Sequence, residues 1–208
     1  MTRQRIIDAA RKTLTAPVLR SFNVSEVADL AGVVRSTIYT VFGSRQGLLE
    51  AVVDDTIDSD AWERMREAFR HPDALVAVVR NLEEGTRLAA SGHNVIAAIS
   101  TLAAVDADAA AVMAEADARR LDGLDVLARR MHEQGYLRPE LAHDEAVDIL
   151  YMLSDWRTVE RLYSDRGLDH TAVARRVVTM ATLTLCRPEA LAAAKTERQP
   201  PDDDTDTP

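Results

Sequence analysis

Two short helical segments joined by a single glycine, near the start of the chain, constrain its fold more than any other feature. Asn23 is followed three residues later by Glu26, which is the spacing of a capping box at the start of a helix. The first segment covers residues 24–31, and Gly32 suits the left-handed conformation that ends a helix. The second segment covers about residues 35–42. The pattern therefore predicts two helices that meet at a tight turn.

The second segment has an apolar side and a polar side. Ile38 and Phe42 lie four residues apart, so both side chains are expected to point inward. The side chains that we expect to face outward can all form hydrogen bonds: Arg35, Ser36, Thr37, Tyr39 and Thr40. A polar helix face of this kind, supported by a short helix and a tight turn, fits the major groove of DNA. We therefore predict a helix-turn-helix motif whose partner is DNA.

Helical periodicity extends over the rest of the chain, and no segment alternates as a strand would. An unbroken ridge of apolar residues spaced by four, from Leu49 to Phe69, predicts one continuous helix over residues 45–70. Other helices are predicted over 2–16, 73–91, 94–104, 107–134, 144–165 and 170–187. The predicted fold class is therefore all-α, with a three-helix helix-turn-helix domain at the N-terminus. Residues 191–208 are predicted to form a disordered acidic tail, because the end of this segment lacks apolar side chains.

The charge distribution separates the N-terminal end from the rest of the chain. The formal net charge is −9, but residues 1–53 hold seven basic and four acidic side chains, a net charge of +3. The remaining residues therefore carry a net charge of −12. A basic end on an acidic body indicates that only the basic end meets a polyanion such as DNA.

Other patterns in the sequence exclude several classes of protein. Cys186 is the only cysteine, so no disulfide can form within the chain, which favours a reducing compartment. No run approaches the roughly 18 uncharged residues of a membrane span. No zinc-ligand spacing and no nucleophile motif occurs. We therefore predict a cytoplasmic protein with no membrane partner, no metal, no cofactor and no enzymatic activity.

Several separated motifs occur together in the order and spacing of one known family. They are Ile6-Ile7-Asp8-Ala9-Ala10, Val27-Ala28, Ala31-Gly32-Val33, Ile38-Tyr39, Phe42, Ser44-Arg45 and Leu48-Leu49. Over residues 3–53 the chain resembles the TetR family of transcriptional regulators. The resemblance implies a homodimeric repressor that binds palindromic operator DNA and is released by a small-molecule effector. It implies a DNA-binding domain over 1–53 and a helical effector-binding and dimerisation domain over 54–190.

The same resemblance implies roles for individual residues of the DNA-binding domain. Thr37 and Tyr39 would contact phosphates, and so would Arg45, which stands where the family usually has lysine. The residues nearest the base edges would be Arg35, Ser36 and Thr40. Arginine is the side chain that most often reads guanine, through two parallel hydrogen bonds, so the chemistry of Arg35 agrees with this role.

The ends of the two short helices carry further expectations. Asn23 and Ser25 at the start of the first helix would either contact a phosphate or serve only in capping. Val34 stands where the family usually has a capping serine, so the second helix is predicted to begin without a side-chain cap.

Two sets of bulky residues in the body are candidates for binding. Residues that either line an apolar effector cavity or belong to the ordinary core are Trp62, Met65, Phe69, Met113, Tyr151 and Trp156. The last two predicted helices carry apolar residues on more than one face, so one face needs a partner. Residues predicted to meet a second copy there are Ile149, Leu153, Trp156, Val173, Val177 and Met180. The continuous helix over 45–70 would connect the effector cavity to the DNA-binding domain.

Two other classes of protein are compatible with parts of this pattern. A helical ligand-binding or interaction module that has lost DNA binding would have the same helices, and DNA-binding measurements distinguish it. A ferritin-like oxidase would need a Glu-x-x-His pair on each of two helices, both facing inward, and the sequence holds only one such spacing, from Glu140 to His143.

Overall fold

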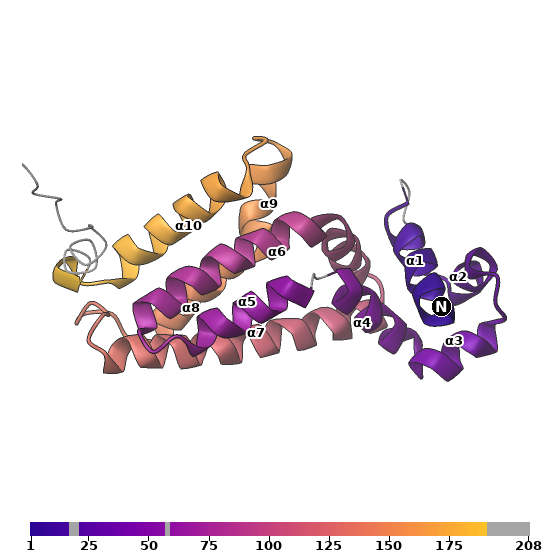
Figure 1. Cartoon of the computed structure of the whole chain (residues 1–208), viewed down its shortest axis with the longest axis horizontal. Helices are drawn as coiled ribbons and strands as arrows, with labels where there is room; N and C mark the ends of the chain where they lie inside the picture. Colours follow the sequence, from indigo (N-terminus) through magenta and orange to yellow (C-terminus); the bar gives the residue numbers. More distant parts are fainter. Residues whose placement is uncertain (17–20, 57–58, 191–208) are drawn as a thin grey trace, which may run out of the picture.

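The computed structural model describes residues 1–16, 21–56 and 59–190, and these residues form helices with no strand (Figure 1). The predicted tail over 191–208 lies outside the described residues. The helices are α1 (Thr2–Leu14), α2 (Val24–Ala31), α3 (Arg35–Phe42), α4 (Arg45–Thr56), α5 (Ser59–Arg70), α6 (Ala74–Ala103), α7 (Ala107–Glu133), α8 (His143–Ser154), α9 (Trp156–Ser164) and α10 (His170–Leu185). We call α1–α4 the head and α5–α10 the body.

The head forms the predicted arrangement of three helices, α1–α3, followed by α4. Asn23 Oδ1 accepts a hydrogen bond from the backbone N of Ser25 at 2.8 Å, which caps α2. Gly32 ends α2 in the left-handed conformation, with φ of 63°. The Arg5 guanidinium donates to the carbonyl oxygen of Ala31, so α1 also holds the end of α2. The local signals for the helix-turn-helix are therefore confirmed.

The body packs around α6, which contacts α5, α7, α9 and α10. Figure 1 shows α10 along one side of α6, and α5 and α7 along the other. In the described part of the chain, no single helix is long and apolar enough to cross a membrane. The segment Asn94–Ala103 and α7 pass that test only as a pair bent by 119°.

Two clusters of buried apolar residues hold the chain together. The body cluster contains the first half of α6 together with residues of α7, α8, α9 and α10. The head cluster contains the buried residues of α1–α4, but it also includes Val95, Ile99 and Leu102 of α6 and Ala109 and Val112 of α7. The apolar core of the head therefore continues into α6 and α7, and these two helices contribute to both clusters.

The prediction of one continuous helix over 45–70 is wrong, because α4 ends at Thr56 and α5 begins at Ser59. Asp54, Asp55 and Thr56 are poor helix formers, since their short polar side chains compete for backbone hydrogen bonds. Thr56 shows this competition, because its hydroxyl donates to the carbonyl oxygen of Val52 at 2.7 Å. An apolar ridge spaced by four residues is therefore compatible with two helices as well as with one.

Two other helix boundaries also differ from the prediction. Residues 74–103 form one helix despite Gly92, since the roughly 1 kcal/mol cost of an interior glycine is small beside the packing of so long a helix. Conversely, residues 144–165 are divided between α8 and α9 at Asp155. The Asp155 backbone is extended and its carboxylate accepts a hydrogen bond from Arg157 N at 2.9 Å, which starts a new helix.

Candidate nucleic-acid interface

Helix α3 lies at the end of the head farthest from α10 (Figure 1). Ile38 is fully buried and Phe42 packs against the head cluster, so these two residues anchor the helix as predicted. Arg35, Ser36 and Thr40 are exposed, and Thr37 and Tyr39 are half-buried. The outward face of α3 is therefore polar and accessible.

The side chains on this face are partly positioned by one another. Arg35 Nη2 donates to the hydroxyl of Tyr39 at 3.0 Å, and the Arg35 guanidinium carbon lies 5.4 Å from the centre of the Tyr39 ring. The Thr40 hydroxyl donates to the carbonyl oxygen of Ser36 at 3.0 Å. Arg35 keeps its other N–H donors for an external partner, whereas the Thr40 hydroxyl is left to act as an acceptor.

Arg3 is a further cation beside α3 that the sequence patterns did not single out. It is exposed near the start of α1, and its guanidinium carbon lies 5.5 Å from the centre of the Phe42 ring. Within the described residues, neither Arg3 nor Arg35 has a carboxylate within ion-pair distance. No local spacing could have revealed this proximity, because it joins residues 39 positions apart in different helices.

Other basic residues of the head are used inside the protein. Arg5 donates to the backbone carbonyls at the end of α2, and Arg11 pairs with Asp8 and Asp55. The net charge of +3 for residues 1–53 therefore overstates the positive charge available to an external polyanion.

Arg45 does not take the predicted phosphate-binding position, because its guanidinium is occupied within the protein. It forms a two-pronged ion pair with Asp106, and its Nη1 also lies 2.7 Å from Asp108 Oδ2. Its Nε donates to the carbonyl oxygen of Phe22 at 3.2 Å. Arg45 instead joins the first turn of α4 to the N-terminal end of α7.

Asp106 has a second role in this junction. Its carboxylate accepts a hydrogen bond from Ala109 N at 3.1 Å and so caps α7. The hydrogen bond from Arg45 holds the pKa of Asp106 below its ordinary value, although partial burial opposes this shift. The carboxylate is therefore stabilised in its charged form by the contact between head and body.

The first residues of α2 and α3 are capped as the sequence predicts: α2 has a side-chain cap and α3 has none. Asn23 and Ser25 are exposed, and the hydrogen bond that joins them is the one that caps α2. Val34 occupies the N-cap position of α3 without a side-chain hydrogen bond, and 66% of its surface is exposed.

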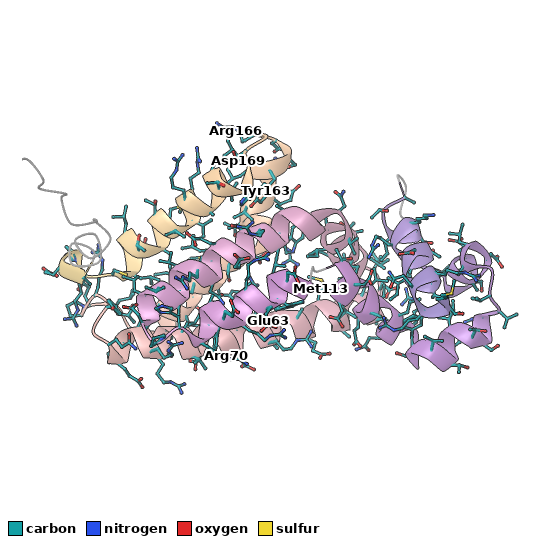
Figure 2. The ribbon with its side chains drawn as sticks, viewed as in Figure 1. Glu63, Arg70, Met113, Tyr163, Arg166 and Asp169 are labelled. Carbon is teal, nitrogen blue, oxygen red and sulfur yellow. The ribbon has the colours of Figure 1, made fainter. Side chains whose placement is uncertain are left out.

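The predicted effector residues are not brought together as one set. Phe69, Tyr151 and Trp156 pack against the body cluster, whereas Met113 packs against the head cluster, at the end of the body nearest the head (Figure 2). Trp62 is exposed and Met65 is half-buried on α5. The Trp156 Nε1 atom is buried and has no hydrogen-bond acceptor among the described residues.

The predicted dimer residues divide into buried and exposed groups. Leu153, Val173 and Val177 belong to the body cluster, so they are core residues and not surface residues. Ile149 and Trp156 are half-buried against the same cluster. Met180 is 57% exposed. Sequence reasoning missed two residues of similar exposure, Met152 on α8 and Leu183 on α10, at 58% each.

Residues 6–52 match the family of bacterial regulatory proteins named tetR. No curated protein sequence matches the chain.

Several solved structures share the fold. The transcriptional regulator FadR from Bacillus subtilis in complex with stearoyl-CoA has a TM-score of 0.68 and 18% identity, covering 86% of this chain and 97% of its own. A transcriptional regulator from Saccharomonospora viridis in complex with choline has a TM-score of 0.67 and 19% identity, covering 89% and 97%. The ketosteroid transcriptional regulator KstR2 of Mycobacterium tuberculosis has a TM-score of 0.65 and 17% identity, covering 90% and 96%.

The ion pair between Arg45 and Asp106 predicts a specific pH dependence of stability. Asp106→Asn keeps a good helix cap but removes the charge, so we expect the free energy of unfolding to fall by about 1–2 kcal/mol at pH 7. Because the pKa of Asp106 is lowered in the folded state, this contribution is complete above the unfolded pKa of about 3.9 and is lost as pH falls below it.

Urea unfolding of both proteins at pH 7, 5 and 3.5, followed by circular dichroism, measures this difference. Asp122→Asn, an exposed position on α7, removes the same charge and should change stability little. A difference between wild type and Asp106→Asn that did not shrink at pH 3.5 would contradict the ion-pair interpretation.

Proposed function

Because the chain belongs to the TetR family of bacterial regulatory proteins, which are DNA-binding transcription factors and not enzymes, we propose that it is a cytoplasmic, homodimeric, effector-responsive repressor. Residues 1–53 bind palindromic operator DNA in this proposal. Residues 54–190 bind a small-molecule effector and form the dimer. Effector binding releases the operator.

The observation that carries the DNA-binding proposal is the outward face of α3. It combines accessible hydrogen-bonding groups with two cations, Arg3 and Arg35, that lack carboxylate partners among the described residues. The rest of the chain is acidic, so a polyanion is attracted to the head and repelled by the body. The alternative, a module that has lost DNA binding, gives no reason for a polar face whose two cations have no carboxylate partner among the described residues.

The DNA contacts proposed for the residues of α3 follow from their position on the helix and from their hydrogen-bonding groups. Arg35, with Ser36 and Thr40, reads base edges in the major groove, because the first turns of a recognition helix approach the bases most closely. The Tyr39 hydroxyl, held by Arg35, and the Thr37 hydroxyl contact phosphates. Asn23 and Ser25 remain phosphate candidates at the start of α2.

Replacement of Arg35 tests the proposal directly. A binding site selected from random duplexes should be bound in a sequence-specific and salt-dependent manner. Arg35→Ala should lower affinity for it by about 1–3 kcal/mol and relax the preference at one base pair in each half-site, because the contact with guanine is lost. Fluorescence anisotropy and repeated site selection measure the two effects.

Lys12→Ala is the matched control for Arg35→Ala. Lys12 is exposed in the last turn of α1 and carries the same charge as Arg35. Its replacement should leave the sequence preference unchanged. Unaltered base preference in Arg35→Ala would contradict its reading role. Absence of specific binding by the wild type, even at low salt, would favour the module that has lost DNA binding.

The proposed response to an effector depends on α6 and α7 and not on one rod over 45–70. Helix α6 contributes to the body cluster through its first half and to the head cluster through its second half. Helix α9, which begins at Trp156, contacts α6. A ligand that packs against Trp156 and accepts a hydrogen bond from its Nε1 atom, which has no acceptor among the described residues, would displace α6, and with it the packing beneath the head.

The similar structures support a ligand site without identifying the ligand. The Bacillus subtilis regulator is described with stearoyl-CoA and the Saccharomonospora viridis regulator with choline, two molecules of different size and charge. The same fold therefore accommodates different effectors, and the effector of this chain follows from its own residues.

Thermodynamic linkage gives the test of the effector response. If a ligand found by thermal-shift screening lowers operator affinity, saturating operator must lower ligand affinity by the same factor, typically about 5–150-fold. Calorimetry with operator, with an unrelated duplex of equal length and without DNA measures this factor. Equal ligand affinities in all three would show that effector and operator sites are uncoupled.

The proposed dimer surface lies on α8 and α10, which contact each other. Met152, Met180 and Leu183 are large apolar side chains on these two helices, and each exposes more than half of its surface. Large apolar side chains exposed on two adjacent helices mark a candidate association surface. A second copy is the proposed occupant, because a palindromic operator requires two symmetry-related heads.

Introducing a charge on this surface tests the dimer. Met180→Asp together with Leu183→Asp should convert a dimer into monomer at micromolar concentration, because two carboxylates would be buried without partners. Val126→Asp on α7, on the opposite side of α6 from α10 in Figure 1, is the control and should remain dimeric. Sedimentation velocity distinguishes the species, and a monomeric wild type would refute the proposed dimer.

A further inference from the structure

Val34 is an exposed apolar residue at the edge of the proposed recognition surface. It occupies the N-cap position of α3 with extended backbone angles, φ of −83° and ψ of 149°, and makes no side-chain hydrogen bond. Serine, threonine, asparagine and aspartate are the usual residues at this position, because their side chains accept a hydrogen bond from the first turn of the helix, which valine cannot do. Valine therefore gives no local advantage to the helix that it begins.

The turn before α3 directs consecutive valines to opposite sides. Val33 packs against the head cluster, whereas Val34 is 66% exposed and is not part of that cluster. Val34 also directly precedes Arg35, which is exposed and has no carboxylate partner among the described residues. The edge of the proposed DNA-binding face thus presents an apolar group immediately beside a cation.

Only one base presents an apolar group in the major groove. Thymine carries a C5-methyl there, and the other base edges present hydrogen-bond donors and acceptors. Adjacent Cα atoms are about 3.8 Å apart, which is close to the roughly 3.4 Å rise between base pairs. A methyl contacted by Val34 therefore belongs to the base pair that Arg35 reads or to its immediate neighbour.

Building on the proposed function, we infer that Val34 is a specificity-determining residue whose side chain packs against the C5-methyl of a thymine in each operator half-site. The methyl lies within one base pair of the position read by Arg35. The contact removes two apolar groups from water and adds sequence preference without a hydrogen bond.

Deoxyuridine substitution isolates the methyl group. After an operator is selected with the wild-type protein, each thymine is replaced singly by deoxyuridine, which removes only the C5-methyl, and the dissociation constant is measured by fluorescence anisotropy at fixed salt. One thymine in each half-site should show a loss of about fourfold, the equivalent of about 0.8 kcal/mol for one buried methyl-sized group. That thymine should lie within one base pair of the position at which Arg35→Ala relaxes the preference.

Variants at residue 34 then assign the methyl contact. Val34→Ala and Val34→Ser should bind the thymine and deoxyuridine operators equally well at that position. Val34→Ser also restores a capping side chain, so a folding defect is not expected to explain its result. Val126→Ser, an exposed valine on α7, should keep the wild-type profile.

Three outcomes are decisive. Loss of deoxyuridine sensitivity only in the Val34 variants supports the inference. Specific operator binding with no sensitive thymine, or a sensitivity that persists in Val34→Ala, overturns the inference but leaves the proposed function standing. Failure of the wild type to select any operator overturns both.

Discussion

The ion pair between Arg45 and Asp106 fixes the head on the body, and the proposed function depends on that placement. Arg45 belongs to the first turn of α4, Asp106 caps α7, and the same guanidinium also donates to the backbone of Phe22, just before α2. A partly buried arginine that loses its carboxylate is costly, because its charge remains away from water without a partner. The orientation of α3 relative to α7 is therefore held by charge as well as by apolar packing.

The apolar packing at this junction makes the head an extension of the body. Ile99 and Leu102 of α6 and Val112 of α7 share one cluster with the buried residues of α1–α4. Densely packed interiors resist gradual deformation, so a displacement of α6 is expected to move the head as a unit. A division at residue 53 describes the sequence motif well, but it cuts through a continuous core.

Local signals in the sequence were sufficient to predict the helix-turn-helix. Asn23 and Gly32 act within one turn of the chain, and the spacing of Ile38 and Phe42 reflects burial on a short helix, so neither depends on distant segments. The prediction of one helix over 45–70 failed because an apolar ridge does not reveal a break among polar residues such as Asp54 and Asp55. That break also removed the route first expected for the effector signal.

The errors in the candidate sites have a common physical cause. The family resemblance predicts a phosphate contact for Arg45, and local spacing does not reveal its partners, Asp106 and Asp108, because they lie more than sixty residues away in the sequence. Val173 and Val177 were assigned to a dimer surface because periodicity marks an apolar face without showing what covers it. Arg3 was overlooked for the same reason, since its neighbour Phe42 belongs to another helix. Spacing predicts faces, whereas the partner of each face is decided by tertiary packing.

The internal pairing of the head's cations also bears on the proposed recognition of DNA. Arg5, Arg11 and Arg45 are occupied by carbonyls or carboxylates, so Arg3 and Arg35 are the arginines beside α3 that lack a carboxylate partner among the described residues. Each phosphate neutralised by a protein cation contributes to non-specific affinity, so a head with few free cations on an acidic body is expected to bind random DNA weakly. Discrimination among sequences then depends on contacts with the bases themselves. In the proposed interface, one guanidinium and one adjacent apolar side chain would account for a large share of the specific affinity, because little non-specific attraction would compete with them.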